Sequence, residues 1–110
     1  MINLLIVDGH TELHALYEAA FRANSFQVTL AVSAAQVSRY SADVVLVDAA
    51  ALGLLDHAFL DYISERPTVV LSNYTDHDER TSLRDRATAR FTKADTPITS
   101  LPEIVQSVLR

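Results

Sequence analysis

The sequence contains no cysteine, only two glycines and three prolines, and no long hydrophobic run. Without cysteine the chain forms no disulfide, has no thiol chemistry and has no cysteine-ligated zinc, which fits a reducing compartment such as the cytoplasm. The scarcity of glycine and proline matches the absence of any linker or low-complexity segment. The longest apolar window, Val44 to Leu55, is interrupted by Asp48 and is too short to span a bilayer. Asp8 interrupts the first apolar stretch in the same way, so no signal peptide is predicted.

Positive charge is also scarce, since 9 basic residues face 14 acidic ones and the formal net charge is −5. An acidic chain is a poor general binder of nucleic acid, so we expect neither direct nucleic-acid binding nor a membrane role. The 110 residues, 49% of them hydrophobic, predict one folded domain over residues 1–110. The basic residues are uneven, because five of the nine lie in one short segment: Arg80, Arg84, Arg86, Arg90 and Lys93.

The order of apolar patterns along the chain indicates alternating strands and helices. Strands are predicted at residues 2–7, 26–31, 44–47, 68–71 and 89–92. Helices are predicted at 11–23, 34–40, 56–65, 75–87 and from 101 onward. This alternation predicts an α/β fold: a flavodoxin-like five-stranded parallel sheet of order 2-1-3-4-5 with helices on both faces.

Thr11 is the expected cap of the first helix, and Asn24-Ser25 closes it, since asparagine tolerates the left-handed conformation. The apolar stripe of this helix, which should face the core, is Leu13, Leu16, Tyr17, Ala20 and Phe21.

Polar side chains stand where the predicted strands end. Asp8 follows the first strand, Asp48 the third, Ser72 the fourth and Lys93 the fifth. The carboxyl ends of parallel strands form the usual ligand site of such sheets. A carboxylate there can attack phosphorus, a divalent cation can neutralise the incoming group, and a lysine and a hydroxyl can hold its oxygens.

Four segments at these strand ends, LLIVDGH, DVVLVD, VVLSNYTD and RFTKAD, together with Gly53, resemble the receiver domain of bacterial two-component response regulators. The resemblance covers nearly the whole chain. It implies that Asp48 is the phosphoacceptor and that Asp8, Asp48 and the backbone carbonyl of Ala50 hold Mg²⁺. It also implies that Ser72 is the switch hydroxyl and that Lys93 bonds the phosphoryl group.

Two departures from the pattern of that family affect the expected site directly. The second acid of the usual acidic pair is Gly9, which removes a direct metal ligand and should weaken Mg²⁺ binding. Glu12, one helical turn away, is a candidate to compensate. The aromatic switch position is Arg90, and strand alternation predicts that the adjacent Phe91 lies on the other face of the sheet.

The resemblance implies a cytoplasmic signalling domain rather than an enzyme, phosphorylated by a sensor histidine kinase or a phosphotransfer protein. The alternative is a degenerate receiver that acts as an interaction or dimerisation module without phosphorylation. Arg84 and Arg90 are candidates for a partner or homodimer surface formed by the 75–87 helix, the fifth strand and the last helix. A solvated helix face explains the same arginines equally well.

Other sites are less well supported by the residues. His10 and His14 have the spacing of zinc ligands, but no third ligand is evident, so we expect capping or solvated histidines. Ser72, His77 and Asp78 lack the glycine-flanked elbow of hydrolases. The loop after the first strand carries two acids and one glycine, which is unsuited to the phosphate of a flavin cofactor.

Overall fold

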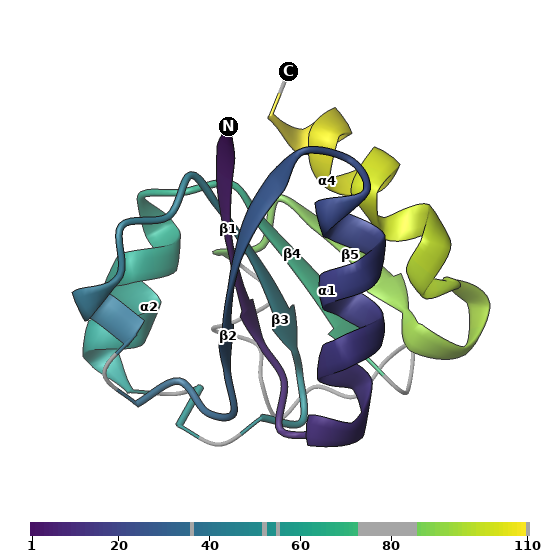
Figure 1. Cartoon of the computed structure of the whole chain (residues 1–110). Helices are drawn as coiled ribbons and strands as arrows, with labels where there is room; N and C mark the ends of the chain where they lie inside the picture. The colour runs from purple at the N-terminus through teal and green to yellow at the C-terminus, as the bar shows by residue number, and fades with distance from the viewer. Residues whose placement is uncertain (36, 52, 55, 73–85, 110) are drawn as a thin grey trace.

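The computed structural model describes residues 1–35, 37–51, 53–54, 56–72 and 86–109, and a five-stranded parallel sheet lies at their centre (Figure 1). Its strand order is β2-β1-β3-β4-β5, as predicted. The strands are β1 (Ile2–Val7), β2 (Phe26–Ala31), β3 (Val44–Asp48), β4 (Thr68–Ser72) and β5 (Ala89–Thr92).

Helices cover both faces of the sheet. In Figure 1, α1 (His14–Arg22) and α4 (Leu101–Val108) lie side by side on one face, and α2 (His57–Ser64) lies on the other. The side chain of Asp56 accepts a hydrogen bond from the Phe59 amide at 3.3 Å and caps α2. The helix predicted at 75–87 falls almost wholly on residues outside the described part of the chain. Where a helix was predicted at 34–40, a single 3-10 turn, Val37–Arg39, is found.

The central strands β1, β3 and β4 are largely buried on both faces, because successive side chains point to opposite sides and helices cover both sides of the sheet. Leu4 and Ile6 of β1 join the core under α1 and α4, whereas Leu5 and Val7 join the core under α2. All five residues of β3 are buried, which explains why its sequence is an unbroken apolar run rather than an alternating one. The helices contribute their own buried residues: Tyr17, Phe21, Phe59, Leu60, Ile63, Leu101 and Val105.

The beginning of the first helix differs from the prediction. A 3-10 turn, Thr11–Leu13, precedes α1, and Thr11 lies inside this turn, so it does not cap the helix. The cap position before the turn is His10, whose side chain makes no capping bond. Leu16 matched the apolar stripe of this helix but is 55% exposed, because α1 packs on the sheet through Tyr17 and Phe21. In the turn that follows α1, Ser25 rather than Asn24 takes the left-handed conformation, with φ of 67°.

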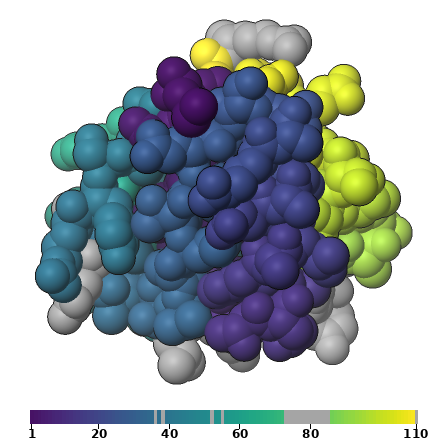
Figure 2. All heavy atoms as spheres, viewed as in Figure 1, coloured from purple at the N-terminus to yellow at the C-terminus, as the bar shows by residue number. Residues whose placement is uncertain are grey.

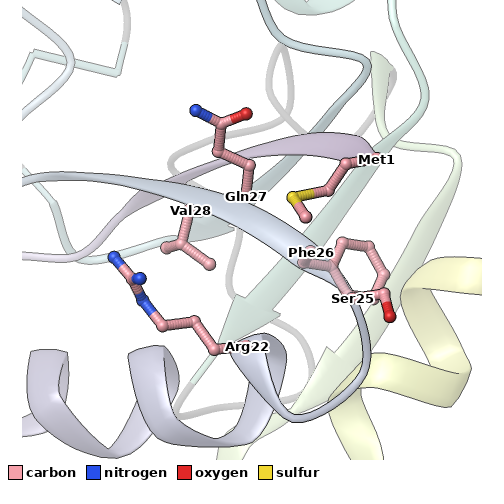
Figure 3. A pocket seen from close by; sticks show the side chains of 6 residues that line it. All are labelled: Met1, Arg22, Ser25, Phe26, Gln27 and Val28. Carbon is pink, nitrogen blue, oxygen red and sulfur yellow. The ribbon is translucent and has the colours of Figure 1, made fainter.

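In Figure 2, α1 covers the centre and right of the front of the molecule, and α4 lies at the right edge. A surface pocket lies at the amino ends of β1 and β2, on the opposite end of the sheet from Asp8 and Asp48 (Figure 3). It is lined by Met1, Arg22, Ser25, Phe26, Gln27 and Val28. No helix within the described residues is long and apolar enough to cross a membrane.

Candidate functional site

Two buried carboxylates lie at the carboxyl end of the sheet. Asp8 follows β1 directly, and its amide extends the sheet by donating to the Ala31 carbonyl at 2.9 Å. Asp48 is the last residue of β3 and stands opposite Leu71 in the register with β4. The two residues are 1% and 2% exposed. Because β1 and β3 are neighbours in the sheet, residues 40 positions apart in the sequence share one site.

Lys93 bridges these two carboxylates. It begins a 3-10 turn, Lys93–Asp95, directly after β5. Its Nζ donates to Asp8 Oδ2 at 3.0 Å and to Asp48 Oδ2 at 3.3 Å. A half-buried ammonium between two buried carboxylates offsets the repulsion between them. The predicted meeting of Asp8, Asp48 and Lys93 is therefore present.

His10 also contacts both carboxylates, which the sequence did not predict. Its Nδ1 lies 2.9 Å from Asp8 Oδ1 and 3.1 Å from Asp48 Oδ2. The His10 amide donates to Asp8 Oδ1 as well, at 2.8 Å. The chain turns sharply after Asp8, and this turn brings the imidazole back over the ends of β1 and β3.

Tyr17 is the second residue of the site that the sequence did not predict. It comes from the buried face of α1, and its hydroxyl donates to Asp8 Oδ2 at 2.7 Å. The apolar stripe of the helix placed its ring in the core, and a buried tyrosine hydroxyl requires a partner. That requirement was the available signal, but it did not identify Asp8 as the acceptor.

These hydrogen bonds perturb the ionisation of the groups that make them. Burial alone would raise the pKa of Asp8, but bonds from the Tyr17 hydroxyl, the His10 amide and the Lys93 ammonium outweigh it and lower the pKa to about 2. Burial and the bond to Asp8 raise the pKa of the Tyr17 hydroxyl, so it remains a donor. The hydrogen bond to Asp8 raises the pKa of His10 above its ordinary value.

The other candidate residues take different positions. His14 Nε2 lies 2.7 Å from the backbone carbonyl of Asp8, so His10 and His14 do not form a paired zinc site. Glu12 is exposed, and it is absent from the one group of clustered ligands found among the described residues, which comprises Asp8, His10 and Asp48. It therefore does not replace the missing acid. Ser72 ends β4 beside Thr92 at the same edge of the sheet.

The remaining predicted residues lie around this centre. The amide of Ala50 donates to Asp48 Oδ1 at 3.2 Å, which holds the backbone of residue 50 against the carboxylate. Arg90 is exposed on β5 opposite Val70, on the α2 side, while Phe91 packs in the core under α1 and α4, as the alternation predicted. Arg84 lies outside the described residues.

The donor set at this site suits a divalent cation. Atoms of Asp8, His10 and Asp48 that can ligate a metal all lie within 4.8 Å of one another. Carboxylate oxygens are ligands for Mg²⁺, and an imidazole nitrogen is a ligand for transition metals. A cation at this place would compete with the hydrogen bonds that His10 and Lys93 now make.

Solved structures of receiver domains share this fold. No protein-family model and no curated protein matches the sequence. A response regulator receiver domain from Francisella superimposes with a TM-score of 0.79 at 17% identity, over 99% of this chain and 97% of that one. The chain thus has the fold of response regulator receiver domains, as the resemblance implied.

Two further neighbours bear on the site. One is the receiver domain of a sensor histidine kinase from Pseudomonas aeruginosa, with magnesium coordinated in its active-site cleft. It has a TM-score of 0.78 and 18% identity, over 98% of this chain and 97% of that one. The other is an orphan response regulator of H. pylori, with a TM-score of 0.73 and 16% identity, over 99% and 97%. At such identities the likeness establishes the fold alone.

Proposed function

We propose that this chain is a receiver of phosphoryl groups in two-component signalling, with Asp48 as the phosphoacceptor. The observation that carries the proposal is the convergence of Asp8, Asp48 and Lys93 at the carboxyl end of the sheet, where the Lys93 ammonium lies 3.0 Å from Asp8 and 3.3 Å from Asp48. Two buried carboxylates and a lysine rarely meet at the end of a sheet for stability alone, because burying a charged group costs free energy unless it is fully paired. Such clusters are typical of functional sites.

The proposed reaction is a transfer between two nucleophiles. An Asp48 carboxylate oxygen forms a bond to phosphorus while the bond from phosphorus to the imidazole nitrogen of a phosphohistidine donor breaks, and that nitrogen keeps the electron pair. Lys93, already 3.3 Å from Asp48 Oδ2, is placed to bond a phosphoryl oxygen. Ser72, which ends the neighbouring strand β4, would bond another phosphoryl oxygen and report the change.

A divalent cation would be held by Asp8, Asp48 and the backbone carbonyl of Ala50. When bound, Mg²⁺ would neutralise the charge of the incoming phosphoryl group. Asp8 suits this role because its low pKa keeps it ionised at any physiological pH. The work of the chain is to hold two ionised carboxylates close together, which Tyr17, His10 and Lys93 do through hydrogen bonds.

The donor would be a sensor histidine kinase or a phosphotransfer protein in the cytoplasm, and the chain would act as a signalling domain rather than an enzyme. Phosphorylation would then shift a partner-binding surface between two states.

That partner-binding surface, or a homodimer interface at the same place, would include Arg90, which is exposed on β5. Arg90→Ala should weaken self-association or partner binding, whereas Arg22→Ala on α1 should not; sedimentation that is identical for both variants and the wild type would exclude the homodimer interface.

Intact mass tests the proposal directly. The protein incubated with Mg²⁺ and acetyl phosphate should gain one phosphoryl group, and Asp48→Asn should abolish the gain. Asp61→Asn, which changes an exposed aspartate on α2, is the matched control and should keep it. An adduct that survives in Asp48→Asn, or no adduct in the wild type, would contradict the assignment of Asp48.

The second candidate function is a degenerate receiver that binds partners without phosphorylation. It is favoured by one observation: both oxygens of Asp8 are already occupied, one by His10 and the other by Tyr17 and Lys93. The site is thus neutralised by the side chains of the protein, and Gly9 supplies no further ligand. Under this function the wild type gains no phosphoryl group, yet a partner binds the wild type and Asp48→Asn equally well.

A further inference from the structure

His10 stands in the position of a metal ligand rather than only of a hydrogen-bond donor. Its Nδ1 is 2.9 Å from Asp8 Oδ1 and 3.1 Å from Asp48 Oδ2. Adjacent ligands on one octahedral ion with bonds of about 2.1 Å are separated by about 3.0 Å. The nitrogen therefore has the spacing of a neighbouring ligand from each of the two oxygens, and the ligand atoms of the three side chains all lie within 4.8 Å of one another.

We infer that Asp8, His10 and Asp48 form a site for a divalent ion of the zinc class, such as Zn²⁺ or Co²⁺, in preference to Mg²⁺. Mg²⁺ prefers oxygen ligands, whereas imidazole favours the later transition metals. The inference deepens the proposed function and rests on it for the role of the ion, but binding itself requires no phosphoryl donor.

The surroundings of the three side chains support this assignment. Tyr17 and Lys93 hold Asp8 Oδ2, which leaves Oδ1 directed toward His10. The His10 side chain is 44% exposed, whereas both carboxylates are buried. An ion would therefore be bound by the two buried carboxylates on its inner side. Water could occupy its remaining coordination positions on the exposed side, near His10.

Binding has a defined proton balance. Both acceptors around His10 Nδ1 are carboxylate oxygens, so in the metal-free protein this nitrogen carries the proton and donates it. A metal bond to Nδ1 replaces that N–H. A neutral ring then carries its proton on Nε2 and releases no net proton, whereas a doubly protonated ring releases one proton for each ion bound.

Calorimetric titration with Zn²⁺ and with Mg²⁺, without any phosphodonor, tests the inference on the whole chain and on two variants. His10→Ala removes the nitrogen. His14→Ala is the matched control, because His14 contacts only the backbone carbonyl of Asp8 among the atoms of the site. We expect His10→Ala to weaken Zn²⁺ binding by at least about tenfold and to leave Mg²⁺ binding unchanged or stronger, since a competing donor is gone.

His14→Ala should change neither affinity by more than about twofold, the effect of a residue outside the ligand set. The visible absorption of bound Co²⁺ gives a second readout, because loss of a nitrogen ligand changes its bands. His10→Asn replaces His10→Ala if the alanine variant is unfolded by circular dichroism. Equal loss of Zn²⁺ and Mg²⁺ binding in the His10 variant, or no loss of Zn²⁺ binding, overturns the inference. If the protein binds Zn²⁺ through His10 but gains no phosphoryl group, the metal site is supported and only the proposed phosphorylation of Asp48 is contradicted.

Discussion

Asp8 and Asp48 end neighbouring strands and are equally buried, yet the protein holds them differently. Asp8 accepts bonds of 2.7 to 3.0 Å from the Tyr17 hydroxyl, the His10 amide and ring, and the Lys93 ammonium. The contacts of Asp48 are longer, at 3.1 Å to His10, 3.2 Å to the Ala50 amide and 3.3 Å to Lys93. Asp8 is therefore the more tightly held of the two, while Asp48 keeps the freedom that the proposed phosphoacceptor requires.

Replacing each carboxylate by its amide should separate the two roles most strongly. Asp8→Asn places an NH₂ group among the donors of Tyr17, His10 and Lys93 and should lower the free energy of unfolding by about 3 kcal/mol, as for a buried pair that loses one partner. Asp48→Asn should cost less than about 1 kcal/mol, because its bonds are long and the substitution removes a like charge. Urea denaturation at neutral pH measures both; equal losses would show that the two carboxylates are held alike.

Acid should remove the contribution of Asp8 in a defined range of pH. Its folded pKa of about 2 lies below the ordinary 3.8, so ionisation of Asp8 stabilises the fold above pH 3.8. That contribution is lost as the pH falls from about 4 to about 2 and amounts to about 2 kcal/mol. Other acids titrate in this range, so the quantity to follow is the difference between the wild type and Asp8→Asn. A difference that stays constant from pH 5 to pH 2 would contradict the low pKa.

The hydroxyl of Tyr17 provides the next comparison. Tyr17→Phe removes a 2.7 Å bond to a carboxylate and should cost about 2 kcal/mol, the value for a hydrogen bond to a charged group. Tyr62→Phe is the control, because its hydroxyl donates at 2.9 Å to the neutral Tyr40 carbonyl and should contribute about 1 kcal/mol. Thermal and urea denaturation of both variants test this order. Equal costs would mean that the charge of Asp8 adds nothing to the bond.

The sequence predicted the sheet because its signals were local and agreed with one another. The apolar runs gave the five strands, and alternation with helices then determined the order β2-β1-β3-β4-β5. Asp8, Asp48 and Lys93 were predicted together because each directly follows or ends a strand, and parallel strands end at one edge.

The rest of the site depended on side-chain directions that periodicity does not specify. Tyr17 was predicted as a core residue, but its acceptor depends on how α1 lies along the sheet. His10 was interpreted as a capping or solvated histidine, because nothing in its spacing shows that the turn after β1 folds its ring back onto two carboxylates. Threonine is a common helix cap, so Thr11 was predicted to cap a helix that begins at residue 12. The chain instead forms a 3-10 turn that already includes Thr11.

Substitution of Gly9 should have the smallest effect on stability among these variants, and it tests directly whether the missing acid of the acidic pair limits Mg²⁺ binding. A Cβ atom at this position would meet the Val32 carbonyl at 3.4 Å, and its backbone is not left-handed, so Gly9→Asp should alter stability by less than about 0.5 kcal/mol. A third carboxylate beside Asp8 should nevertheless tighten Mg²⁺ binding by about tenfold, since Mg²⁺ favours oxygen ligands and negative charge. Gly9→Asn, which has the same size without the charge, is the control for calorimetry. If both variants bind Mg²⁺ as weakly as the wild type, the limit on the site lies in the bonds that already occupy Asp8, not in the acid missing at position 9.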